Sequence, residues 1–284
     1  MKKKVKTYTL YKPSITTFVD ILGFREIIRT VPSDKISKSL KIIRELQKEN
    51  SDLSHSWLSA VKSKYHQINF SDSTIRSVSY EDSNNISFIA SLSYEIENLI
   101  LIQRSLIAES ILVRGGIADG NLHIKEDEVF GPGLVKAYDL ESKFAIYPRI
   151  VLDPILIKKL NSTISNLSEN LKRTSGEQLA YQLAMEARKS LIRSEDGIYY
   201  IDYLSYQPDS DLYYDQLSFE KIIIQHRKII KLQTKKKITP DVQLKYNWLS
   251  YYHNSTVSKN LNLFKNPKKG FSYKITEKEN KYII

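Results

Sequence analysis

Two aspartates lie beside sharp changes of chain direction, and the first of them interrupts an apolar stretch. Asp20 lies in residues 17–24 (TFVDILGF), where a predicted strand runs into Gly23 and then into a predicted helix. A carboxylate in an apolar strand is costly to bury unless it is paired or binds a cation. Backbone N–H groups at a turn from a strand into a helix suit an anion such as phosphate. The stretch therefore predicts either a site for a metal ion and a triphosphate or a partly exposed acid at a strand end.

The second aspartate, Asp72, lies at the tip of a predicted hairpin. Residues 67–80 (QINFSDSTIRSVSY) alternate in polarity on both sides of a tight turn at residues 71–73. Acids near the ends of adjacent antiparallel strands can hold two divalent cations about 3.5–4 Å apart, which stabilise the attacking and leaving oxygens of an in-line displacement. Magnesium favours one or two carboxylates together with substrate phosphate oxygens. Asp72 could instead only cap its turn, which is a common use of Asp.

The elements expected around these acids follow the order strand, helix, hairpin, helix, strand, helix, strand. We expect strands over residues 18–22, 111–118 and 146–152, helices over 24–49, 84–110 and 132–142, a break at 31–33 and a turn at 119–120. Gly115 and Gly116 interrupt the middle strand, which indicates close backbone approach. This order is that of a ferredoxin-like α+β core, and we expect its helices to cover one face of the sheet.

Residues 155–284 follow a different pattern from residues 1–154. The second half is expected to be a mainly helical C-terminal extension with one strand near residues 198–204 and helices over 218–235 and 240–252. The domain organisation predicted is a catalytic core over 1–154 and an extension over 155–284 that packs on the core or on a dimer partner.

Composition narrows the class of protein. The 284 residues include 41% hydrophobic side chains, no cysteine and a formal net charge of +11. The lack of cysteine excludes disulfides and thiolate metal sites. No signal-peptide h-region is evident and no apolar run approaches the ~18 residues of a bilayer span, so we expect a soluble, cytoplasmic protein with no membrane partner. The positive charge suits polyanions, including nucleotides and nucleic acids, without choosing among them.

Four short blocks occur in order within residues 15–153. They are FVDILGF (18–24), FSDS (70–73), VRGGIADG (113–120) and FGPGLVKAYDLE (130–141). Together they resemble the catalytic domain of class III nucleotidyl cyclases. The resemblance implies attack of the ribose 3′-hydroxyl on the α-phosphate, which gives a 3′,5′-cyclic nucleotide and pyrophosphate. The protein's own part would be positioning and charge stabilisation.

The resemblance also implies a role for individual residues. Asp20 and Asp72 match the two catalytic aspartates that bind two Mg²⁺ or Mn²⁺ ions, and the Ile21 carbonyl matches a backbone metal ligand. Arg114 matches an arginine that contacts the triphosphate, although it could instead be a structural arginine in a buried pair. The loop whose amides hold the β- and γ-phosphates matches Leu22, Gly23 and Phe24. Family cyclases assemble their sites across a homodimer, so residues of both subunits would meet at each site.

Several positions depart from the purine-cyclase pattern. Val135 and Asp139 stand where purine cyclases have an Asn and an Arg that aid the transition state. Ile68 and Glu128 stand where those enzymes have a lysine and an acid that read adenine. The base preference therefore differs from that of an ordinary adenylate cyclase. Possible base or transition-state contacts are Glu128 and Lys136. Candidates for replacing the missing cation are Lys136, Lys143 and Arg149.

Other stretches more closely resemble the bacterial pyrimidine cyclases of Pycsar antiphage defence. They are RGGI (114–117), YPRIV (147–151), DGIYYIDYL (196–204) and YNWLSYYHN (246–254). This resemblance implies CTP or UTP as substrate and cCMP or cUMP as a second messenger that activates a separate effector. Two alternatives remain open: a cyclase-fold nucleotide sensor without turnover, and a basic nucleic-acid-binding protein, for which no RNA-binding motif is present.

Overall fold

The computed structural model describes residues 11–38, 40–41, 62–126, 128–169, 174–204, 216–234, 238–264 and 272–276. The part of the expected 24–49 helix after residue 41 lies outside these ranges. Within them, no helix is long and apolar enough to cross a membrane.

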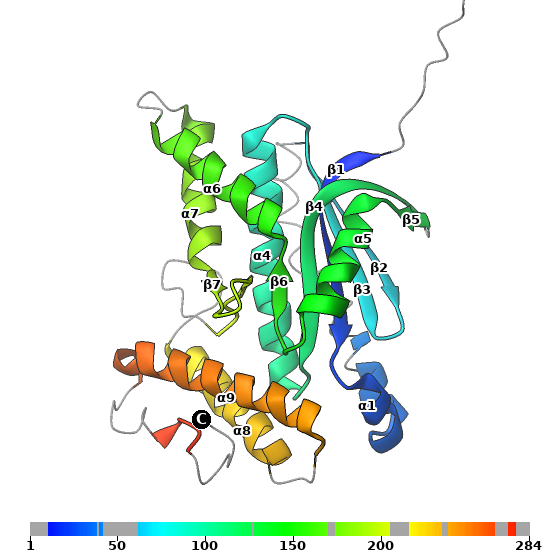
Figure 1. The fold of residues 1–284 in the computed structure, drawn as a ribbon, viewed down its shortest axis with the longest axis vertical. Coiled ribbons are helices and arrows are strands. Elements are labelled where there is room, and N and C mark those ends of the chain that lie inside the picture. Colours follow the sequence, from blue (N-terminus) through cyan, green and yellow to red (C-terminus); the bar gives the residue numbers. More distant parts are fainter. Residues whose placement is uncertain are drawn as a thin grey trace, which may run out of the picture.

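One mixed sheet runs through the molecule (Figure 1). Its strands are β1 (Lys12–Ile21), β2 (Lys64–Phe70), β3 (Ser73–Ser79), β4 (Val113–Lys125), β5 (Glu128–Phe130), β6 (Ile150–Leu152), β7 (Leu191–Arg193) and β8 (Tyr199–Ile201). The order across the sheet is β2-β3-β1-β4-β6-β8-β7, and β5 pairs with β4. β4 and β6 run parallel, and the other pairs run antiparallel. The predicted α+β core and its order of elements are confirmed.

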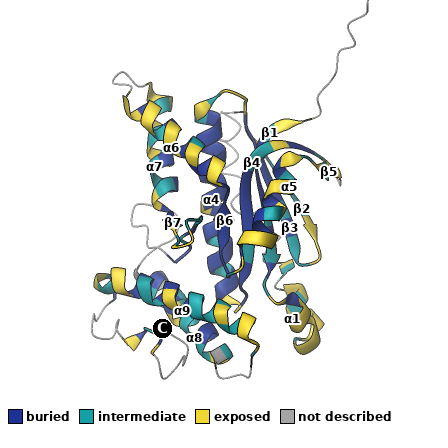
Figure 2. Cartoon of the chain, in the orientation of Figure 1, coloured by how far each residue is buried: buried dark blue, intermediate teal, exposed yellow. Residues whose placement is uncertain are grey.

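Helices pack around this sheet. They are α1 (Phe24–Thr30), α4 (Asn85–Ala108), α5 (Pro132–Asp139), α6 (Pro154–Glu169), α7 (Ser175–Lys189), α8 (Gln216–Thr234) and α9 (Pro240–Lys259), with a π-helical turn η1 (Leu140–Phe144) and a 3-10 turn η2 (Leu261–Leu263). α1 ends at Thr30, at the predicted break. Figure 2 shows that α4 and the inner strands form the buried centre.

The helices cover both faces of the sheet, so the expectation of one covered face was wrong. Thr17 and Phe18 are neighbours on β1 and must point to opposite faces. Thr17 donates a hydrogen bond to Glu95 on α4, whereas Phe18 contacts the Tyr138 ring on α5 edge-on at 5.3 Å. α5 can approach because β4 has glycines: a Cβ on Gly116 would lie 2.4 Å from the Ala137 carbonyl oxygen.

The turn predicted at residues 119–120 is absent, because β4 continues through it to Lys125. Asp119 accepts a hydrogen bond from the Tyr80 hydroxyl at 2.6 Å and pairs with the Lys159 Nζ at 2.7 Å. Gly120 leaves room for the start of α5, where a Cβ would meet Gly133 at 2.9 Å. Asp119 and Gly120 therefore do not form a turn. Asp119 bonds to Tyr80 and Lys159, and Gly120 lets α5 pack closely against β4.

The second half of the chain adds strands and helices to the same core. β8 confirms the strand expected near residues 198–204, and α8 and α9 confirm the two expected helices, whereas β7 was not predicted. α7 lies along α4, where the Ser93 hydroxyl donates to the Leu183 carbonyl at 3.1 Å. The domain boundary at residues 154/155 stays a prediction, since strands from both sides of it share the sheet.

Candidate active site

The end of β1 and the β2–β3 hairpin bring the two predicted acids together. Asp20 is paired in register with Ser73, and the Ile21 amide donates to the Asp72 carbonyl at 3.3 Å. The hairpin turns through Ser71, whose φ of 53° lies in the left-handed region that a two-residue hairpin loop requires. The predicted hairpin and the closeness of the two acids are therefore confirmed. Their role as metal ligands stays a prediction.

The Asp20 carboxylate is half-buried and only partly compensated. Burial raises the pKa of Asp20, and the neighbouring Asp72 raises it further. The Ser73 hydroxyl, which donates to Asp20 Oδ1 at 3.0 Å, and the Arg114 charge lower the same pKa without cancelling the rise. Because the charged form of this acid is disfavoured in the unliganded protein, a bound cation would stabilise it strongly.

Arg114 is shared between two acids on the α5 face of the sheet. It lies opposite Asp20 in the β1–β4 register, with its Nη2 3.8 Å from Asp20 Oδ2. Its Nε lies 2.7 Å from Glu141 Oε1. The angle at this contact does not meet hydrogen-bond geometry, and Glu141 Oε1 accepts no hydrogen bond from the described residues. Because 27% of the Arg114 side chain is exposed, it can also reach a ligand.

Glu141 belongs to this cluster, and sequence reasoning did not assign it a role. Only 4% of its side chain is exposed; this burial raises its pKa, Arg114 lowers it and Asp20 raises it again. It lies on η1, where the helix widens into a π turn, a feature found often at functional sites. The π turn shifts the helical phase, so the 3.6-residue period could not show where this acid points.

The turn after β1 fits the predicted phosphate loop in part. Gly23 has a φ of 78°, which permits the sharp turn from β1 into α1. The amides of Gly23 and Phe24 donate no hydrogen bond within the described part of the chain, but the Leu22 amide donates to the Leu112 carbonyl at 2.8 Å. Two of the three predicted amides are thus available to an anion.

The oxygen donors at this end of the sheet fit magnesium or manganese. Among the described residues no group of three or more His, Cys, Asp or Glu side chains is arranged to hold a metal ion. Asp20, Asp72 and the Ile21 carbonyl are oxygen donors that would instead form an open set of ligands. Such a set is completed by substrate phosphate oxygens in magnesium sites, and the under-compensated Asp20 agrees with it.

The two other predicted contacts lie elsewhere in a single chain. Glu128 is on β5, paired with Lys125 of β4. Lys125 is 11 residues from Arg114, which is about 36 Å along β4 at ~3.3 Å per residue. The Glu128 Oε2 lies 3.6 Å from His123 Nε2. Lys136 is on α5, with its Nζ 3.7 Å from Asp153 Oδ2. One chain therefore does not bring Glu128 to the Asp20 site.

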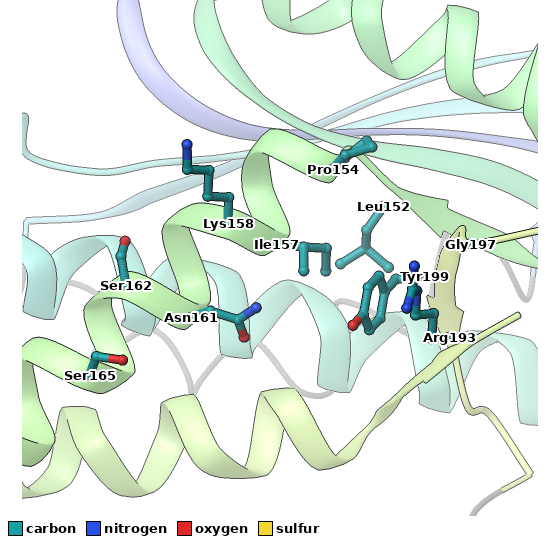
Figure 3. Close-up of a pocket in the computed structure, with 10 residues that line it drawn as sticks. All are labelled: Leu152, Pro154, Ile157, Lys158, Asn161, Ser162, Ser165, Arg193, Gly197 and Tyr199. Carbon is teal, nitrogen blue, oxygen red and sulfur yellow. The ribbon is translucent and has the colours of Figure 1, made fainter.

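A cavity of about 520 Å³ opens elsewhere, between α6 and the β7–β8 hairpin (Figure 3). Leu152, Ile157 and Tyr199 give it apolar walls, and Lys158 and Arg193 give it positive charge. None of the predicted site residues lines it. The acids and the cavity are thus separate features.

Comparison with known proteins finds only distant similarity. No protein-family model and no curated protein matches the chain. Among solved structures, the guanylate cyclase domain of RhGC from Catenaria anguillulae in complex with GTP is 14% identical, with a TM-score of 0.40 over 54% of this chain and 84% of that one. A class III adenylyl cyclase-like ATP-binding protein from Pseudomonas aeruginosa is 12% identical, with a TM-score of 0.40 over 95% of this chain and 73% of that one. A bacterial light-regulated adenylyl cyclase is 12% identical, with a TM-score of 0.37 over 75% of this chain and 56% of that one.

Proposed function

We propose that the protein is a nucleotidyl cyclase that converts a pyrimidine nucleoside triphosphate, CTP or UTP, into the 3′,5′-cyclic nucleotide and pyrophosphate. The observation that carries the proposal is the closeness of Asp20 and Asp72 beside the partly exposed Arg114. In the reaction the 3′-oxygen forms a bond to the α-phosphorus, the bond from that phosphorus to pyrophosphate breaks, and the 3′-hydroxyl proton is released.

Each residue of the site has a distinct part in this reaction. Asp20 and Asp72 would hold Mg²⁺ or Mn²⁺ with the Ile21 carbonyl. When bound, such ions neutralise phosphate charge and favour loss of the hydroxyl proton. Ser73 fixes one oxygen of Asp20. Arg114 orients the phosphates, since its planar guanidinium matches their geometry.

A homodimer would complete the site. Glu128 cannot reach Asp20 in its own chain, as the β4 spacing shows, so a base contact by Glu128 needs a second copy. Apolar side chains are exposed on the α5 face: Phe70 at 79%, Val135 at 61% and Tyr138 at 51%. Exposed apolar groups of this kind suit a protein interface.

Ile68 supports a pyrimidine base. It lies on β2 next to the acid-bearing turn, where a purine reader would carry a cation, and it offers no charge or hydrogen bond. In the proposed role, the cyclic nucleotide is a second messenger in antiphage defence that acts on a separate effector.

The test is product identification. Purified protein is incubated separately with ATP, GTP, CTP and UTP in the presence of Mn²⁺, and products are identified by mass spectrometry. We expect cCMP or cUMP from the wild type and from Asp34→Asn, an exposed control, and none from Asp20→Asn or Asp72→Asn. Absence of any cyclic nucleotide, or equal yield from Asp20→Asn, would reject the proposal.

A second candidate is a nucleotide sensor that binds metal and triphosphate without turnover. Asp139, which stands where purine cyclases have an arginine, pairs with Lys143 at 2.9 Å, and Val135 points to solvent. Neither residue can supply transition-state charge. Tight binding of Mn²⁺ and CTP or UTP with no product would favour this candidate over the cyclase.

A further inference from the structure

α9 of the C-terminal extension is fixed next to the strand that carries Arg114. Figure 1 shows its N-terminal half crossing below the end of the sheet at which β4 begins. Trp248 of α9 stacks on Tyr147, with ring centres 5.4 Å apart and 3° between planes. The Arg149 guanidinium lies 5.8 Å from the Trp248 ring, and the Arg149 carbonyl accepts a hydrogen bond from Gly115. Gly115 directly follows Arg114, so these contacts connect α9 to the part of β4 that carries Arg114.

Lys245 lies one helical turn before Trp248, in the half of α9 that crosses below the start of β4, and the charge of Arg114 acts on it. Its side chain is partly buried and makes no hydrogen bond or ion pair with any residue in the described ranges. Burial lowers the pKa of Lys245, Arg114 lowers it further, and Asp241 raises it by less than Arg114 lowers it. Arg114 has Glu141 and Asp20 beside it, whereas Lys245 has only the weaker effect of Asp241, so the charge of Lys245 is not fully compensated. An anion bound between Lys245 and Arg114 would favour the charged form of the lysine.

The other cations considered for the site are already paired with acids. Lys136 lies 3.7 Å from Asp153 Oδ2 and Lys143 lies 2.9 Å from Asp139 Oδ1. The Arg149 guanidinium is 1% exposed and is bound to Asp196 and Ser194 at 2.6 and 2.8 Å. Lys245 has no such partner.

We propose that Lys245 binds the triphosphate of the substrate together with Arg114. This proposal rests on the proposed function, because it takes the Asp20 site as a triphosphate site. It gives the C-terminal extension a direct part in substrate binding, since the lysine comes from α9. A polyphosphate placed between the two cations would relieve their repulsion and form charge-assisted hydrogen bonds with both.

The test measures binding of inorganic tripolyphosphate, which carries the charge of the substrate without its base or sugar. It is titrated with Mg²⁺ into the full chain by calorimetry. We expect Lys245→Gln to weaken binding about tenfold, the size of one hydrogen bond to a charged group, and Lys245→Arg to restore most of the loss. Lys259→Gln is the matched control: Lys259 is an exposed lysine on the same helix, about 21 Å further along its axis at 1.5 Å per residue, and we expect no change.

A chemical readout checks the position of the lysine independently of any variant. Acetylation by an N-hydroxysuccinimide ester, followed by peptide mass spectrometry, reports the reactivity of each amine. We expect tripolyphosphate with Mg²⁺ to protect Lys245 and to leave Lys259 unprotected. Equal acetylation of Lys245 with and without tripolyphosphate would overturn the proposal.

The outcomes separate this proposal from the proposed function. Binding that is weakened by Arg114→Gln but unchanged by Lys245→Gln would overturn the role of Lys245 and leave the triphosphate site intact. No binding of tripolyphosphate to the wild type would overturn both. Binding that depends on Lys245 in a protein that makes no cyclic nucleotide would support Lys245 as a triphosphate ligand and favour the sensor over the cyclase.

Discussion

The two faces of the central sheet each carry an arginine among carboxylates, and the two networks differ in how completely they are satisfied. On the α4 face, Arg76 binds both oxygens of Glu95 at 2.8 and 2.9 Å, and both side chains are at most 1% exposed. On the α5 face, Arg114 divides its guanidinium between Glu141 and Asp20, at 2.7 and 3.8 Å.

The α4-face network is closed to further ligands. Glu95 also accepts a hydrogen bond from Thr17, and Arg76 donates to the Tyr65 hydroxyl at 3.1 Å. Burial lowers the pKa of Arg76, but its interactions with Glu95, Tyr65 and Tyr94 together outweigh burial and raise the pKa overall. A buried pair in which each guanidinium nitrogen and each carboxylate oxygen has a partner holds the fold and is closed to a ligand.

The α5-face network is open. The pKa values of Asp20 and Glu141 are both raised by burial, and Arg114 compensates neither acid fully. In sites that bind charged ligands, charged groups commonly lack full compensation within the protein, at some cost in stability. The difference indicates that one arginine serves the fold and the other serves a ligand.

Removal of Arg76 should give the largest change in stability. Arg76→Met leaves Glu95 buried and unpaired, so we expect the free energy of unfolding to fall by about 3–5 kcal/mol. Arg114→Met should lower it by less, since solvent screens the pair of Arg114 with the partly exposed Asp20 and only Glu141 is left buried without its cation. Urea denaturation of both variants measures the contrast. Equal losses would break the distinction between the two networks.

A second complete network joins α8 to α9 through two fully buried histidines. His253 Nε2 donates to the Tyr273 carbonyl at 2.8 Å, so its Nδ1 is an acceptor. His226 Nδ1 must then donate to His253 Nδ1 at 3.1 Å, which leaves His226 Nε2 to accept from the Tyr203 hydroxyl at 3.2 Å. This assignment of donors and acceptors has both His226 and His253 as neutral imidazoles.

This network predicts a loss of stability on mild acidification. Burial lowers the pKa of His253 to about 4, so the unfolded chain takes up a proton near pH 6.5 before the folded chain does. The stabilisation is present above pH 6.5 and is lost as the pH falls towards 4, by about 2 kcal/mol between pH 7 and pH 5. Urea denaturation at the two pH values measures it. His253→Gln should flatten this dependence, and an unchanged slope would refute the neutral pair.

Neutralising the acid of the open network should have a smaller effect on stability, of opposite sign. Because burial and Asp72 disfavour the charged form of Asp20, Asp20→Asn should raise the free energy of unfolding by about 0.5–1 kcal/mol. Thermal unfolding of the metal-free protein, with Asp34→Asn as control, reports the change. A clear destabilisation would mean that Asp20 serves the fold.

The smallest effect concerns the pH dependence of the proposed reaction. Asp20 must be ionised to hold a cation, so activity should fall as the pH drops through its raised pKa. Ser73→Ala removes a hydrogen bond that lowers this pKa, and the acid limb of the rate should move to higher pH. Ser162→Ala, an exposed serine on α6, should leave the limb in place. An unmoved limb in Ser73→Ala would assign the titration to another group.

The sequence predicted the parts of the site that depend on local patterns. The apolar strand around Asp20 and the hairpin tip at Asp72 were visible because alternation and turn residues act over a few positions. Gly116 indicated close packing, which the contact with α5 confirms. Glu141 and Lys245 were not found, because a π turn and a helix more than one hundred residues from Arg114 place them. No spacing rule describes such distant contacts.

The most direct test of the account measures two properties of Asp20→Asn in parallel. One is the rate of cyclic-nucleotide formation from CTP and UTP with Mn²⁺, and the other is the free energy of unfolding without metal. The open network predicts that the rate falls at least about 100-fold, as for loss of a group that stabilises transition-state charge, while stability is unchanged or higher. A rate within twofold of wild type, or loss of rate that only follows loss of folding, would contradict the account.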